Sequence, residues 1–114
     1  MALIFKIVGA ADWRQAEMAG VFKGAGVDLS DGYIHFSTAE QVAETAAKWF
    51  ADRDDLVLAA VNADALGAAL RWEPSRGGAL FPHLYAPLNM SDVRWSRPLP
   101  RGPDGRHVLG SLEA

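Results

Sequence analysis

A histidine with hydroxyl side chains on both sides lies in the short segment Tyr33–Thr38. In a β-strand, alternation places Tyr33, His35 and Ser37 on one face. Ser37 and Thr38 also precede a predicted helix, where hydroxyl side chains cap the free backbone N–H groups of the first turn. Because those N–H groups and the helix dipole favour an anion, the segment predicts a phosphate-accepting site beside His35.

A second histidine lies in the segment Phe81–Tyr85, where alternation places His83 and Tyr85 on the same face. Glu73 precedes this segment, and its carboxylate could accept a hydrogen bond from a ribose hydroxyl or stabilise a cationic transition state. An ion pair with a neighbouring arginine is the alternative role for Glu73. The two segments predict one small-molecule site, and the alternative is that His35 and His83 are buried in the core for structural reasons.

Lys6 lies in an aliphatic segment, on the same strand face as Ile4 and Val8. Its default role is that of a solvated charge at the edge of a sheet. The alternative is an inward cation with an anionic partner, and in that role Lys6 would help to bind a charged ligand.

The composition limits the classes of partner. The chain has 114 residues, half of them apolar, with a net charge of −3 and no cysteine. We expect one domain over residues 1–114 with frayed last residues. Without a basic run, long nucleic acid is not expected, and no segment is long enough to span a membrane. The absence of cysteine suits the cytoplasm. The oligomeric state stays open.

Hydrophobic patterning predicts the elements that position these residues. Strands are expected at Leu3–Val8, Tyr33–Ser37, Leu56–Val61, His83–Leu88 and Val93–Pro98, and the two main helices at Ala11–Ala19 and from Ser37 to about Ala51. The apolar run Leu56–Val61 is typical of a central strand, and Pro98 indicates an edge strand. We expect helical turns over 62–70 and a mobile loop over 24–32. This pattern favours an α+β fold with a mixed or antiparallel sheet.

The second helix carries the strongest periodic signal in the chain. Apolar positions recur at helical spacing at Val42, Thr45, Ala46, Trp49 and Phe50. This stripe predicts packing against the sheet, with Trp49 in the core.

Several separated motifs occur in order and resemble one known family. They are Ile4–Ile7, then Trp13 and Gly20, Asp31–Thr38 with Glu40 and Gln41, Trp72–Pro74, and Phe81–Tyr85. Over nearly the whole chain they resemble the bacterial family called domain of unknown function 952. That family is similar to a compact ADP-ribosyltransferase fold, nearest the RNA phosphotransferases that use NAD as the acceptor of a phosphate.

The resemblance implies roles for particular residues. His35, with Ser37 and Thr38, would hold the ribose and nicotinamide end of NAD. The phosphotransferases have a histidine-glycine-threonine motif in the first strand, where this chain has Lys6-Ile7-Val8. The implied ligand is a small nucleotide, either NAD or an ADP-ribose derivative.

Four functions are compatible with these residues. The first is an ADP-ribosyl or phosphoryl transferase, or a binder of NAD-like nucleotides, in which Glu73, His83 and Tyr85 close the pocket. The second is a two-histidine phosphoesterase acting on a small cyclic phosphate, because the residues from His35 to Ser37 fit one of its two motifs. The third is a metal site formed by His35, His83 and Glu73, although we expect no metal. The fourth is a non-catalytic ligand-binding module.

Overall fold

The central sheet of the fold has three antiparallel strands. The computed structural model describes residues 2–113. Its strands β1 (Leu3–Gly9), β4 (Leu56–Asn62) and β8 (Val93–Pro98) are ordered β1–β4–β8. β4 is paired on both sides, and Pro98 lies on edge strand β8 opposite Val57. The predicted opening, central and edge strands are therefore confirmed, within one residue at each end.

Short strands form two further antiparallel sheets among the described residues. One has the order β3–β6–β5, with β3 at Ile34–His35, β6 at Leu80–Leu84 and β5 at Leu70–Pro74. The other pairs β2 (Val21–Phe22) with β7 (Leu88–Asn89). In the first of these sheets His35 and His83 are direct cross-strand partners. This register brings the two histidines, far apart in the sequence, onto neighbouring strands.

Three α-helices and four short 3₁₀ helices connect the strands of the described chain. The α-helices are α1 (Ala10–Ala19), α2 (Val27–Asp31) and α3 (Val42–Trp49). The 3₁₀ helices are Ala63–Ala65, Gly67–Ala69, Arg76–Gly78 and Met90–Asp92. α1 ends at Gly20, whose left-handed backbone, with φ of 80°, suits a residue without a Cβ. None of the helices in residues 2–113 has the length and apolar character needed to cross a membrane.

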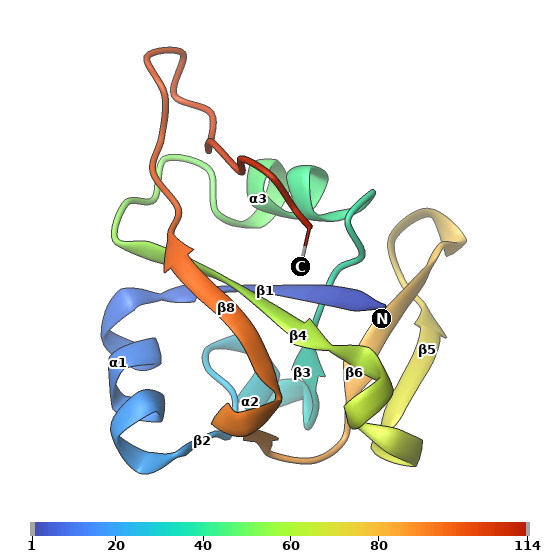
Figure 1. The fold of residues 1–114 in the computed structure, drawn as a ribbon. Coiled ribbons are helices and arrows are strands. Elements are labelled where there is room, and N and C mark those ends of the chain that lie inside the picture. Colours follow the sequence, from blue (N-terminus) through green and yellow to red (C-terminus); the bar gives the residue numbers. More distant parts are fainter. Residues whose placement is uncertain (1, 114) are drawn as a thin grey trace.

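The central sheet is covered on both faces, which explains why β4 is apolar from Leu56 to Val61. One face packs with α1 and the β3–β6 region, and its core includes Ile4, Val8, Trp13, Ala59 and Leu84. The other packs with α3 and the C-terminal segment, through Phe5, Ile7, Val42, Ala46 and Leu58. Figure 1 shows α1 and α3 at different sides of the strands, with the C-terminal segment running beside α3. The fold is α+β, as predicted.

Four local expectations need correction. The predicted strand Tyr33–Ser37 is reduced to β3, and Ser37 instead forms an isolated bridge with Phe5. The predicted strand His83–Leu88 is divided between β6 and β7, and the helix expected from Ser37 begins only at Val42. The segment 62–70, by contrast, forms two 3₁₀ helices, which agrees with the predicted helical turns. The segment 24–32, expected to be a loop, contains helix α2.

Candidate functional site

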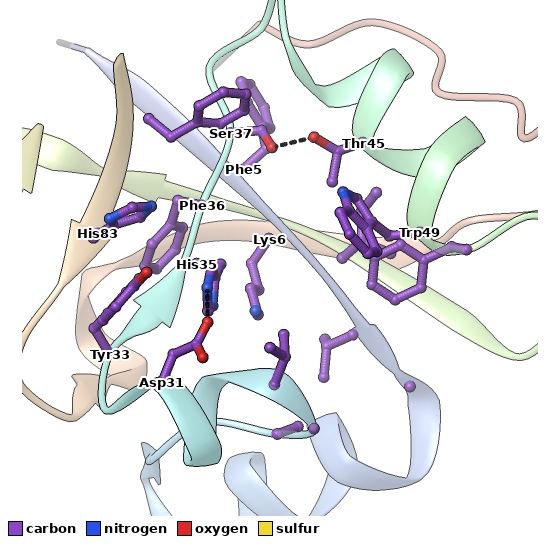
Figure 2. Close-up of a pocket in the computed structure, with 18 of the residues that line it drawn as sticks. Phe5, Lys6, Asp31, Tyr33, His35, Phe36, Ser37, Thr45, Trp49 and His83 are labelled. Atoms are coloured by element: carbon purple, nitrogen blue, oxygen red, sulfur yellow. Dashed lines mark hydrogen bonds and ion pairs between the residues drawn. The ribbon is translucent and has the colours of Figure 1, made fainter. Parts of the chain in front are cut away.

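A pocket of about 520 Å³ opens between β1, β3 and α3, a size that accommodates a nucleotide-sized ligand. At one end Phe5 of β1 bridges to Ser37, two residues beyond β3, with N to O distances of 2.8 and 2.9 Å. Figure 2 shows the two strands diverging from this bridge. His35, His83, Lys6 and Ser37 all line the pocket. Four of the predicted site residues are therefore brought together.

Lys6 is buried, contrary to its default role as a surface charge. It is 7% exposed, and its Nζ lies 2.8 Å from Oδ2 and 3.0 Å from Oδ1 of Asp28, which is itself buried. The alternative role, an inward cation with an anionic partner, is the one observed. A lone ammonium group would be costly to bury, and the carboxylate of Asp28 offsets that cost.

Two carboxylates of α2 hold the ring of His35. Oδ1 of Asp28 lies 2.7 Å from Nδ1 of His35 and also accepts the backbone N–H of His35 at 3.0 Å. Oδ2 of Asp31 lies 3.0 Å from the other ring nitrogen, Nε2. Both nitrogens of an imidazole can donate at once only when the ring is protonated. His35 is thus fixed in orientation, and both of its nitrogens are occupied.

The charges around Asp28 stabilise its ionised form. Burial alone would raise the pKa of Asp28, but hydrogen bonds from His35 and the charge of Lys6 outweigh burial and lower this pKa to about 2. Burial lowers the pKa of Lys6, while its interaction with Asp28 opposes this shift. The ionised carboxylate of Asp28 therefore lies beside His35, and the neighbouring ammonium group of Lys6 balances its charge.

His83 is held by a different carboxylate, that of Glu73 on β5. Nδ1 of His83 lies 2.8 Å from Oε1 of Glu73, and the hydroxyl of Tyr85 donates to the same oxygen at 2.7 Å. With Glu73 as acceptor, Nδ1 of a neutral ring carries the hydrogen and Nε2 keeps its lone pair. Among residues 2–113, Nε2 has no hydrogen-bond partner, and His83 lines the pocket. His83 is only 4% exposed, and Nε2 is the imidazole nitrogen that no protein group occupies at the pocket wall.

Glu73 and Tyr85 lie behind His83, outside the residues that line the pocket. Hydrogen bonds from Tyr85 and His83 lower the pKa of Glu73 below its ordinary value. The hydrogen bond to Glu73 raises the pKa of Tyr85. At neutral pH the carboxylate is thus ionised and the phenol is protonated, which is the state in which both groups orient His83.

Tyr33 packs against both histidines. Its ring centroid lies 4.6 Å from that of His35 and 4.3 Å from that of His83, and the two imidazole centroids are 5.4 Å apart. Burial raises the pKa of Tyr33, and the negative charges of Asp31 and Glu73 raise it further. The phenol therefore remains a hydrogen-bond donor at neutral pH, and Figure 2 shows it between His35 and His83.

The residues before α3 do not form the predicted phosphate site, because their polar groups bond to one another. The backbone N–H of Thr38 donates to Oε1 of Gln41 at 3.0 Å, which is one half of the predicted capping box. The hydroxyl of Ser37 lies 2.7 Å from that of Thr45, and Thr38 lies outside the pocket lining. Because these groups satisfy one another, they do not present a row of free donors beside His35.

Trp49 is not a core residue, and that prediction was wrong. It is 63% exposed and lines the pocket with Phe50 and Arg53. The stripe on α3 is buried at Val42 and Ala46, but Trp49 is the last residue of the helix. Phe50 still packs against this core, but Trp49 turns away from it, and its side chain forms a wall of the pocket.

The metal site considered as the third alternative has no geometric support. In the part of the chain that the structure describes, no group of three or more His, Cys, Asp or Glu side chains is placed to hold a metal ion. Glu73 binds His83 from behind, and both nitrogens of His35 face carboxylates. In the phosphoesterase alternative, the substrate would have to replace Asp31 at Nε2 of His35 before this nitrogen could act as the second acid–base group.

Sequence reasoning did not identify Asp28 or Asp31 as site residues. An ammonium group on a buried strand does imply a carboxylate partner, but the chain has 14 acidic residues and nothing in the spacing selects Asp28. The sequence signal nearest to these two residues is the glycine-rich segment 24–32, which predicts a loop and no carboxylate pair. Asp28 and Asp31 lie one helical turn apart on α2, so both can face His35.

The chain belongs to the family described as Protein of unknown function (DUF952), whose model matches residues 7–96. The X-ray structure of protein CC0527 from Caulobacter crescentus is similar, with 53% identity, 95% of each chain covered and a TM-score of 0.91. The solution NMR structure of CC0527 gives 53% identity and a TM-score of 0.86, covering 96% of this chain and 95% of that one. No curated protein matches the chain.

Proposed function

We propose that this protein binds a nucleotide of the NAD or ADP-ribose class in the pocket and acts on its ribose as an ADP-ribosyl or phosphoryl transferase. The observation that carries this proposal is the pairing of His83 with Glu73, which leaves Nε2 of His83 available to the pocket. A carboxylate that fixes the tautomer of a histidine prepares the opposite nitrogen to accept a proton.

The polar groups of the pocket fit a ribose better than a free anion. Asp31 lines the pocket beside His35, and its carboxylate can accept hydrogen bonds from a pair of sugar hydroxyls. The phenol of Tyr33 can donate to a sugar oxygen. Arg53 supplies positive charge for the phosphates of the ligand, whereas the charge of Lys6 is already balanced by Asp28.

Each residue of the site has a separate role in this reaction. NAD, when bound, would supply an electrophilic ribose carbon, and the bond from this carbon to nicotinamide would break as the attacking oxygen bonds to the carbon. Nε2 of His83 accepts the proton of the attacking hydroxyl or water, Glu73 holds the ring of His83, and Tyr85 holds Glu73. His35 shapes the ribose side of the pocket under the control of Asp28 and does not exchange protons.

The experiment measures release of nicotinamide from NAD, with and without an added acceptor, by chromatography. Wild-type protein should release nicotinamide, and His83→Gln should lower the rate about 100-fold, in the range of a lost general base. Ser111→Ala, in the C-terminal segment, is the matched control and should retain the wild-type rate. If the wild type releases no nicotinamide and does not bind ADP-ribose at millimolar concentration, the proposal is wrong. Binding without release would identify a non-catalytic nucleotide-binding module.

A further inference from the structure

We propose that Trp49 is a stacking platform for the planar base of the nucleotide, so that the base lies at the end of α3 and the ribose lies toward His83. This inference rests on the proposed function, because it assigns one end of the pocket to one part of that ligand. It concerns a side chain for which the sequence indicated only a packing role.

Trp49 is both exposed to solvent and part of the pocket lining. An exposed tryptophan by itself needs no explanation, since single apolar side chains are common on protein surfaces. Trp49, however, is 63% exposed and forms part of the wall of the 520 Å³ pocket. Burying its indole against a ligand would remove a large apolar area from water, and a flat ring can do so without a shaped cavity.

An aromatic ring and a cation lie near Trp49 in the pocket. Phe50 and Arg53 line the same pocket, and the guanidinium carbon of Arg53 lies 5.4 Å from the centroid of the Phe50 ring. This end of the pocket therefore offers aromatic faces with a nearby cation. Stacking on aromatic and guanidinium planes is a recurrent way in which proteins hold a nucleobase.

The aromatic part of the pocket lining is separate from the part that carries hydrogen-bonding groups. Figure 2 shows Trp49 on the side of the pocket opposite His83 and Tyr33, with Lys6 between them in the view. The hydrogen-bonding groups suited to a sugar, Asp31 and Nε2 of His83, lie away from the indole. A ligand with a flat apolar end and a hydroxylated end matches this division, and a nucleotide has both.

The test compares two probes by isothermal titration calorimetry: adenosine monophosphate, which has a base, and ribose 5-phosphate, which lacks one. Trp49→Ala should weaken binding of adenosine monophosphate about tenfold or more and leave ribose 5-phosphate unchanged. Trp49→Phe, which keeps a planar ring, should restore most of the affinity. Trp72→Ala is the matched control, because Trp72 is 46% exposed and lies outside the pocket lining.

The outcomes separate this inference from the proposed function. If the wild type binds adenosine monophosphate and Trp49→Ala binds it equally well, the base does not stack on Trp49, and the proposed function stands. Tighter binding of ribose 5-phosphate than of adenosine monophosphate would also overturn the inference. If the wild type binds neither probe nor ADP-ribose, both proposals are wrong. Circular dichroism of each variant verifies that the fold is retained.

Discussion

At the scale of single residues, the site depends on two histidines that are held by carboxylates in different ways. The ring of His35 lies between Asp28 and Asp31, with both nitrogens occupied. The ring of His83 is held at Nδ1 only, by Glu73. The two residues look equivalent in the sequence, since each has a hydroxyl side chain two positions away. Their different partners give His35 a positioning role and His83 the role of a group that can take up a proton.

The first prediction concerns Asp28 and acid stability. Its pKa in the folded protein is about 2, below the ordinary value of 3.8. Ionised Asp28 therefore stabilises the fold above pH 4, and this contribution is lost as the pH falls toward 2. The shift corresponds to about 2 kcal/mol. The difference in unfolding free energy between the wild type and Asp28→Asn should narrow by roughly this amount between pH 5 and pH 2, as measured by urea denaturation. A constant difference would show that Asp28 is not stabilised by its partners.

The second prediction concerns Tyr85, which acts on His83 through Glu73. Its hydroxyl donates to the oxygen of Glu73 that also faces His83. Removing this donor in Tyr85→Phe should raise the pKa of Glu73 toward its ordinary value, because the ionised carboxylate loses a hydrogen bond. Carbon-detected NMR titration of the glutamate side chains measures this shift. An unchanged titration of Glu73 would mean that the hydrogen bond contributes nothing in solution.

At the scale of elements, the site depends on α2, a helix of only five residues that supplies both carboxylates for His35. Gly26 precedes this helix with φ of 56° and ψ of −123°, and Gly32 follows it with φ of 84°. Side chains strain the backbone in these regions, so glycine is favoured at both ends. The glycines that suggested a loop are therefore the residues that allow α2 to turn Asp28 inward.

The third prediction tests this role of the backbone. A Cβ added at Gly26 would meet no atom within 4 Å, so Gly26→Ala changes backbone strain without a clash. The variant should lose about 1–3 kcal/mol of stability in thermal or urea unfolding. Gly9→Ala is the matched control, since Gly9 has φ of −59°, and it should lose less than about 1 kcal/mol. Equal losses in the two variants would contradict the role of the positive φ.

The elements also show how much could be predicted from the sequence. β1, β4 and α1 were predicted closely, because each is long enough for its apolar pattern to decide between strand and helix. The short strands β2, β3 and β7 span two residues each, which is too few for any periodicity. Trp49 fitted the helical stripe, but the pattern cannot show where a helix extends past the surface it packs on.

The candidate site was predicted unevenly for a similar reason. Alternation correctly placed His83 and Tyr85 on the same side, where both bind Glu73. His83 lies in β6 and Tyr85 directly follows it, so the pairing of β6 with β5 fixes the direction of both side chains. The partner of Lys6 could not be predicted, because it is brought there by the tertiary placement of α2. Glu73 was predicted to contact the ligand, but it lies opposite Phe81 in the sheet, and its carboxylate binds His83 from outside the pocket lining.

At the scale of the whole molecule, β4 joins the two sides of the core. It is paired with both β1 and β8, and its side chains alternate between the core facing α1 and the core facing α3. Because β1 carries Lys6 and forms part of the pocket, the rigidity of the central sheet fixes one wall of the site. The pocket is thus a feature of the packed fold and does not depend on a separate module.

The fourth prediction tests this central packing. Leu58 on β4 is fully buried in the core on the α3 side. Leu58→Ala should cost about 2–5 kcal/mol in unfolding free energy, because it leaves a cavity between sheet and helix. Leu29→Ala, at an exposed leucine of α2, is the control and should change stability by less than about 0.5 kcal/mol. A small loss at Leu58 would mean that the two sides of the core are less tightly packed than the structure indicates.

NMR titration of isotope-labelled protein with ADP-ribose shows whether the pocket between β1, β3 and α3 binds a nucleotide through the groups around His35 and His83. We expect progressive shifts of the backbone amides of residues 33–38 and of His83, together with the indole N–H of Trp49, while amides at the turn 102–105 stay in place. If none of the pocket residues shifts at millimolar ADP-ribose, the proposed nucleotide site is wrong.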